Sequence, residues 1–67
     1  MTALDFLRQF PLPSRERAGP ASATEMRRWF DGGGVWFNAE LTGWREPIDF
    51  PVASLVLFPR GRRVTLW

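Results

Sequence analysis

Arginine is the side chain best suited to functional chemistry in this sequence. All nine basic residues are arginines, and histidine, cysteine and tyrosine are absent. A guanidinium group binds phosphate in a bidentate manner and also stacks on nucleic-acid bases. Arg27 and Arg28 are the best candidates, since they lie near the predicted start of a helix, where free amides favour anions. Ser22 and Thr24 add two hydroxyl groups there. This pattern predicts contacts with a phosphate backbone.

Two further groups of arginines lie outside this helix. Arg60, Arg62 and Arg63 fall within four residues at the predicted tip of a hairpin. There they either contact phosphate or protect an exposed strand end from aggregation. Arg15 and Arg17 lie in a proline-rich loop and are expected to be mobile, either as a flexible arm on a phosphate backbone or as part of a solvated connector. Both alternatives stay open for each group.

The same residue types argue against catalysis. Without histidine, cysteine, lysine or tyrosine, the usual pairs of nucleophile and general base cannot be built. Glu40 and Asp49 are possible acid–base partners, but nothing in their spacing selects them. The Gly32–Gly34 run follows a helix and lacks the Gly-Lys-Ser/Thr ending of a phosphate-binding loop. We therefore expect no enzymatic activity, no catalytic residue, no metal site and no cofactor.

A helix over residues 23–31 must position the first group of arginines. Ser22 and Glu25 have the spacing of a capping box, in which the serine hydroxyl accepts from the third helical amide and the carboxylate accepts from the amide of the cap residue. Apolar residues then recur at helical spacing on one face. Gly32–Gly34 end the helix and allow a sharp turn into a β-rich segment.

The rest of the chain predicts an α+β fold in a single domain, residues 1–67. A first helix over residues 3–10 is capped by Thr2 and stopped by Pro11. A loop fills residues 11–21, and strands lie within residues 35–67. The expected strand segments are Val35–Phe37 with Glu40–Thr42 after an Asn38-Ala39 turn, Ile48–Phe50 at an edge, and the hairpin Leu55–Phe58 with Val64–Trp67. The fold class is thus two short helices packed on a small antiparallel sheet with a C-terminal β-hairpin.

The apolar positions of these elements give the expected core. It consists of Leu4, Leu7, Met26, Trp29, Phe30, Val35, Phe37, Leu55 and Leu57. A chain of this length has an unfavourable ratio of surface to volume, and its four tryptophans and six phenylalanines supply the large buried areas that such a domain needs.

Part of the chain also resembles a known family. The segments Ser22-Ala23-Thr24-Glu25-Met26-Arg27-Arg28, Gly33-Gly34 and Val35-Trp36-Phe37-Asn38-Ala39 are similar to the alpha-L motif of the S-four-type RNA-binding domain. This domain occurs in the small-subunit ribosomal protein of that name, in tyrosyl-tRNA synthetase C-terminal domains and in pseudouridine synthases. Leu4-Asp5-Phe6-Leu7 resembles the first helix of the family, so the likeness covers residues 4–40.

The resemblance implies a module that binds structured RNA, of the ribosomal or transfer RNA class, by shape and backbone contacts. It implies an RNA surface around Ser22, Thr24, Arg27 and Arg28. Two features depart from the family pattern. Ala39 stands where the family usually has a glycine in the turn, and the loop from Pro11 to Ala21 is longer than is typical.

A net charge of only +2 keeps a second function class open. A non-specific nucleic-acid binder usually carries more positive charge, so any basic patch must come from clustering. A small protein-interaction module of the phage type, which binds and inhibits or redirects a cellular enzyme, has this size and charge. Exposed tryptophan and arginine dominate such interfaces, which makes Trp36, Trp44 and Trp67 candidate contacts.

The location of the protein is inferred from absent signals. No apolar run approaches the roughly 20 residues of a membrane span. The N-terminus lacks a basic region followed by an apolar stretch, and the chain has no cysteine for disulfides. We therefore expect a cytoplasmic protein without a membrane partner.

Overall fold

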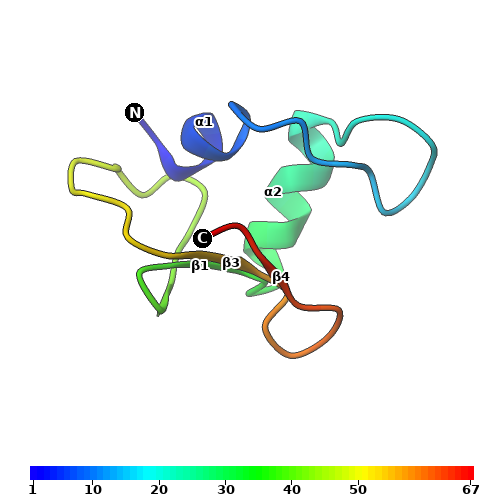
Figure 1. Ribbon diagram of the computed structural model, residues 1–67. Coiled ribbons are helices and arrows are strands. Elements are labelled where there is room, and N and C mark those ends of the chain that lie inside the picture. Colours follow the sequence, from blue (N-terminus) through cyan, green and yellow to red (C-terminus); the bar gives the residue numbers. More distant parts are fainter.

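Two short helices lie on one side of a four-stranded antiparallel sheet in the computed structural model, which describes residues 1–67 (Figure 1). The elements are α1 (Ala3–Leu7), α2 (Ala23–Asp31), β1 (Val35–Phe37), β2 (Glu40–Leu41), β3 (Leu55–Leu57) and β4 (Val64–Thr65). The strand order is β2-β1-β3-β4, and all three pairs are antiparallel. The α+β fold class and the C-terminal β-hairpin predicted from the sequence are confirmed.

The core lies between the helices and the sheet. All nine residues predicted to form it are buried, and Ala3 and Leu12 join them in one apolar cluster. Alternation along the central strands explains the pattern, because successive side chains of a strand point to opposite faces. Val35 and Phe37 of β1 therefore face the helices, whereas Trp36 faces the other side of the sheet and is only partly buried.

Helix α1 is shorter than predicted. A complete capping box starts it, in which the Thr2 hydroxyl accepts from the Asp5 amide and the Asp5 carboxylate accepts from the Thr2 amide. The α-helix ends at Leu7, and the prediction of a helix over 3–10 is wrong at its end. Residues 8–10 form a tighter turn instead, since the Phe10 amide donates to Leu7 O. Pro11 explains this, because a residue before proline is disfavoured in the α conformation.

Helix α2 spans the predicted range and begins at the predicted cap. The Ser22 hydroxyl accepts from the Glu25 amide at 3.1 Å. We expect Ser22→Ala to lose about 1 kcal/mol of unfolding free energy, because that amide loses its partner. In a domain of this size this corresponds to a melting temperature about 4 to 8 °C lower. Thr24→Ala, two residues later and also exposed, is the control, and an equal loss in both variants would contradict the assignment of the cap.

The end of α2 depends on two glycines. Gly33 has a φ of 73°, a left-handed conformation that glycine adopts without strain and that commonly ends a helix. Gly34 lies against the ring of Phe58, and a Cβ atom added there would stand 3.1 Å from the ring and 3.2 Å from Trp29 O. The Phe58 amide also donates to Gly34 O at 2.7 Å. The helix end and the start of the 58–63 loop are thus packed together.

The β1–β2 hairpin turns at Asn38 and Ala39, as predicted. Both residues have positive φ values, 53° and 65°, which is the geometry of a two-residue type I′ turn. Asn38 also holds the chain that enters β3, because its side-chain oxygen accepts from the Ala53 and Ser54 amides. Asparagine tolerates this conformation well, whereas Ala39 adopts it at a cost.

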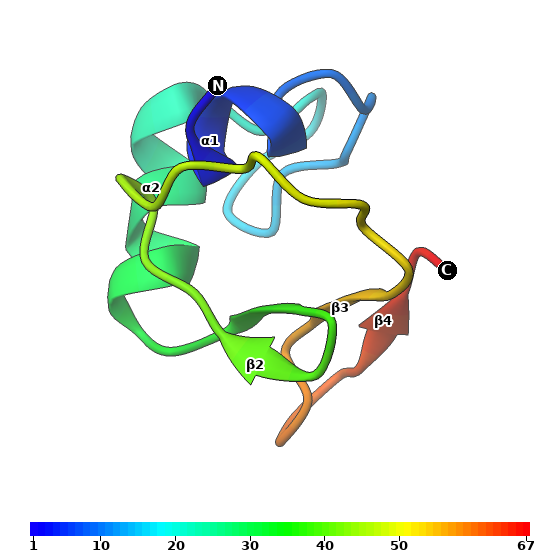
Figure 2. The same cartoon turned by 90° about the vertical axis from the view of Figure 1, so that its left-hand side faces the viewer.

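Residues 48–50 do not form the predicted strand. The chain meets the N-terminus here through an isolated bridge between Thr2 and Pro47 and a hydrogen bond from the Ile48 amide to Met1 O. Pro47 and Pro51 flank it, and neither has an amide that can donate to a ladder. Figure 2 shows β2 at one edge of the sheet and the following segment passing α1 on its way to β3.

Candidate nucleic-acid interface

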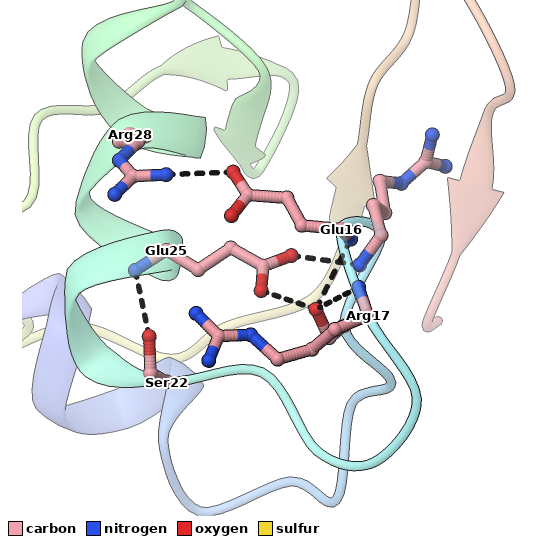
Figure 3. A network of polar contacts seen from close by, with 7 residues as sticks. Glu16, Arg17, Ser22, Glu25 and Arg28 are labelled. Atoms are coloured by element: carbon pink, nitrogen blue, oxygen red, sulfur yellow. Dashed lines mark hydrogen bonds and ion pairs between the residues drawn. The ribbon is translucent and has the colours of Figure 1, made fainter.

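Glu25 fixes the 11–21 loop to helix α2 (Figure 3). Its carboxylate accepts from the Ser14 hydroxyl at 2.5 Å and from the Arg15 amide at 2.7 Å, and the residue is only 2% exposed. Ser14 Oγ in turn accepts from the Glu16 and Arg17 amides. The carboxylate does not return to Ser22, so the predicted second half of the capping box is wrong. The loop offers two donors that satisfy the buried carboxylate together.

These contacts perturb the acidity of Glu25. The Ser14 hydroxyl above all, and then the Arg15 amide, stabilise the carboxylate and lower the pKa of Glu25 below its ordinary value of 4.5. Burial acts in the opposite direction, while the charges of Arg17 and Arg28 add to the lowering. The ionised form is therefore the one that the folded protein prefers.

This shift predicts a loss of stability in acid. A folded-state pKa below the unfolded value gives a contribution that is complete above pH 4.5 and disappears as the pH falls through the folded pKa. We expect Glu25→Gln to lose less stability than the parent between neutral pH and acid, as measured by urea unfolding. Ser14→Ala removes the main cause of the shift and should also flatten the dependence. Parallel curves for all three proteins would contradict this origin of the acid sensitivity.

Arg15 connects the 11–21 loop to the β3–β4 loop. Its guanidinium group lies 3.7 Å from the centre of the Phe58 ring, and its Nη2 donates to Arg62 O at 3.0 Å. A cation over an aromatic face is favourable, and more so when it is partly desolvated. The sequence predicted a mobile arm here, but the loop is held at both Glu25 and Phe58. Two segments 47 residues apart in sequence therefore meet at one place.

A groove of about 350 Å³ opens at this meeting point. We call it the arginine groove, and it is lined by Arg15, Gly32–Gly34 and Phe58–Arg62. Arg15, Arg60 and Arg62 supply three positive charges, and no carboxylate is among the lining residues. A second hollow of about 430 Å³ shares Arg15, Phe58 and Arg62 with it. The combined surface suits an extended anionic ligand.

The attraction for anions in this groove must come from the side chains. The groove lies at the C-terminal end of α2, where the helix dipole disfavours a negative charge by about 0.3 to 1 kcal/mol at the surface. The Gly32 amide donates to Arg28 O and the Gly34 amide donates to Trp29 O, so both amides are already bonded. Three guanidinium groups outweigh this term, since each charged hydrogen bond contributes about 1.5 to 3 kcal/mol.

The two helix arginines predicted as the main phosphate contacts point to different neighbours. Arg28 pairs with Glu16 at 2.7 Å, next to the 11–21 loop (Figure 3). Arg27 lies over the Trp44 ring, 5.3 Å from its centre. Both remain exposed. Arg28 therefore lies next to the 11–21 loop, whereas Arg27 lies next to the turn after β2.

The other predicted residues also lie at different places on the surface. Thr24 is exposed on the first turn of α2, and the Ser22 hydroxyl is used as the cap. Arg17 is close enough to Glu25 for its charge to lower the pKa of that carboxyl. Arg63 is exposed beside the groove without lining it. Of the nine predicted residues, the structure brings Arg15, Arg60 and Arg62 together.

Sequence reasoning missed two residues that form cation–π contacts in this structure. Phe58 forms the aromatic floor under Arg15, and its place directly before the Pro-Arg-Gly-Arg-Arg run was the available signal. Arg45 lies over Trp44 at 4.6 Å and shares that ring with Arg27. The neighbouring Trp44-Arg45 pair was visible in the sequence, but its proximity to α2 was not.

A scan against protein-family models and searches of curated proteins and solved structures give no match for this chain. The structure has no cluster of three carboxylate, histidine or cysteine side chains that is suited to a metal ion. Neither helix is long and apolar enough to cross a membrane.

Proposed function

We propose that this protein is a small RNA-binding module that recognises structured RNA through backbone and shape contacts, with the arginine groove as its main phosphate site. The observation that supports this most is that Arg15, Arg60 and Arg62, from two distant loops, line one groove that contains no carboxylate. Phosphate groups dominate the affinity of nucleic-acid complexes, and arginine is well suited to binding them. The resemblance of residues 4–40 to the S-four-type domain supports the same function.

Backbone recognition fits this groove better than stacking of single-stranded bases. Proteins that bind single strands usually offer free aromatic faces to the bases. The ring of Phe58 in the groove is already covered by Arg15 at 3.7 Å. Structured RNA of the ribosomal or transfer RNA class, which presents phosphates at fixed positions, is therefore the preferred ligand.

Arg28 is the proposed second contact. Its pair with Glu16 is exposed, with 60% and 45% of the two side chains accessible, and such pairs contribute less than about 1 kcal/mol. An RNA phosphate can therefore replace the Glu16 carboxylate at little cost. Arg17, Arg27 and Arg63, with the hydroxyls of Ser22 and Thr24, extend the proposed RNA surface beyond the groove.

The salt dependence of binding tests the proposal. Affinity for transfer RNA should fall steeply as salt rises, because each neutralised phosphate releases counterions with a slope of about 0.7 to 0.9 in log K against log salt. Three contacts in the groove give a slope of about 2 to 3. Filter binding from about 50 to 300 mM salt measures it, with a single-stranded oligonucleotide of equal length as the comparison. Weak binding that does not change with salt would contradict the proposal.

The alternative is a phage-type protein-interaction module that binds and inhibits or redirects a cellular enzyme. The observations in its favour are the net charge of only +2 and the exposed Trp67 and Leu41 side chains. Such a complex would be held by apolar contacts and would tolerate salt. Partners recovered from lysate after ribonuclease treatment would favour this alternative, whereas partners lost after treatment would favour RNA.

A further inference from the structure

A larger groove shares no lining residue with the arginine groove. It has a volume of about 620 Å³ and lies between β2 and residues 46–51, and we call it the β2 groove. Glu40 and Glu46 line it, and no basic residue does. Figure 1 shows the two regions clearly, with residues 44–52 on the left and the 13–20 and 58–63 loops on the right. The protein thus carries opposite charges on two separate grooves.

The backbone of β2 is unpaired on the side away from β1. Leu41 is opposite Trp36 in the ladder, and the next residue, Thr42, donates its amide to Val35 O at 3.1 Å. Bonded and non-bonded pairs alternate in an antiparallel ladder, so the Leu41 amide and carbonyl point away from β1. Because β2 is at the edge of the sheet, these two groups are available to a further strand.

Apolar side chains accompany this free edge. Leu41 is 65% exposed and Phe50 is 41% exposed, and both line the β2 groove. Ile48, Pro47 and Pro51 also line it. Isolated exposed apolar residues are common on protein surfaces, but a groove that joins them to a free strand edge is typical of a peptide-binding site.

We propose that the β2 groove binds an extended basic segment of a partner protein. The segment adds a strand beside β2 through the Leu41 amide and carbonyl, places an apolar side chain against Phe50, and directs arginine or lysine toward Glu40 and Glu46. The charge of the groove selects this occupant, since the two carboxylates repel an RNA phosphate and attract a basic chain. The inference does not depend on RNA binding, because the two grooves have no lining residue in common.

Binding of a peptide to the edge of β2 is expected to be weak, because few interactions are available there. Two backbone hydrogen bonds strengthen binding by only about two- to tenfold each, and exposed ion pairs contribute less. The apolar contact and the two carboxylates must supply the selectivity. A short peptide is therefore expected to bind weakly, because association also costs translational and rotational freedom.

A designed peptide tests the proposal directly. The probe is a fluorescein-labelled seven-residue peptide that alternates arginine with valine, and its binding is measured by fluorescence anisotropy on the full chain. Leu41→Pro removes one outward amide that makes no bond within the sheet, so the fold should persist while the affinity falls about tenfold. The double variant Glu40→Gln and Glu46→Gln should weaken binding about fivefold.

Matched controls separate backbone pairing from simple charge attraction. Leu41→Ala keeps the amide and should retain more affinity than Leu41→Pro, and Glu16→Gln removes one carboxylate outside the β2 groove without effect. A peptide with proline at its centre should bind poorly. Equal binding by the parent, Leu41→Pro and the double glutamate variant would overturn the proposal. So would a concentration-dependent dimer that Leu41→Pro disperses, because a second copy would then occupy the groove.

Discussion

Trp29→Ala is expected to remove a large part of the free energy of unfolding of this protein. Trp29 is 8% exposed, belongs to the apolar cluster between α2 and the sheet, and packs edge-on against Phe58 at 5.3 Å. Truncating a buried aromatic residue typically costs about 3 to 5 kcal/mol. A domain of this size has a total stability of about 3 to 10 kcal/mol. Circular dichroism and urea unfolding measure the loss.

Two control variants test whether the loss in Trp29→Ala comes from the buried aromatic ring. Trp29→Phe keeps an aromatic ring and should retain a cooperative transition at a lower urea concentration. Leu41→Ala removes an exposed side chain and should change stability by less than about 0.5 kcal/mol. If Trp29→Ala melts like the parent, the ring does not contribute to the core and the phase of α2 in this fold is wrong.

The triple variant Arg15→Gln, Arg60→Gln and Arg62→Gln will lose nearly all affinity for structured RNA. If each arginine neutralises one phosphate, the salt slope falls by about 2 to 3, and affinity at 0.1 M salt falls by about two to three orders of magnitude. Filter binding to transfer RNA over the same salt series provides both numbers. Thermal unfolding should be recorded in parallel, since Arg15 also packs on Phe58.

A pair of double variants removes the structural role of Arg15 from this test. Arg60→Gln with Arg62→Gln changes the groove, whereas Arg8→Gln with Arg45→Gln makes the same change of charge elsewhere. We expect the first pair to reduce the salt slope by about 1.4 to 1.8 and the second to leave it nearly unchanged. Equal losses in the two pairs would show that net charge alone drives binding, and the groove would have no special role.

Local patterns predicted the elements of this fold well. The apolar stripe of α2, its serine cap and the Gly32–Gly34 run each depend on neighbours in sequence, and the helix appeared over the predicted residues. The nine core residues followed from the same periodicities. The Asn38-Ala39 turn was also visible, because a two-residue turn fixes the register of the strands on both sides.

Contacts between distant segments could not be predicted in this way. The partner of Glu25 was placed at Ser22, three residues away, because a capping box is local, but Ser14 and Arg15 compete for the same carboxylate and win. The arginine groove depends on that anchor, since it brings Arg15 to Phe58. Residues 48–50 have the alternation of a strand, yet flanking prolines remove the donors that a ladder requires. No single-sequence pattern reports such competition.

The two grooves differ in the sign of the charged residues that line them, and this has a consequence for how the molecule meets its ligands. The potential around an RNA molecule attracts Arg60 and Arg62 and repels Glu40 and Glu46, so approaches that present the arginine groove are favoured. Orientation before contact raises the rate of productive encounters even when the net charge is small.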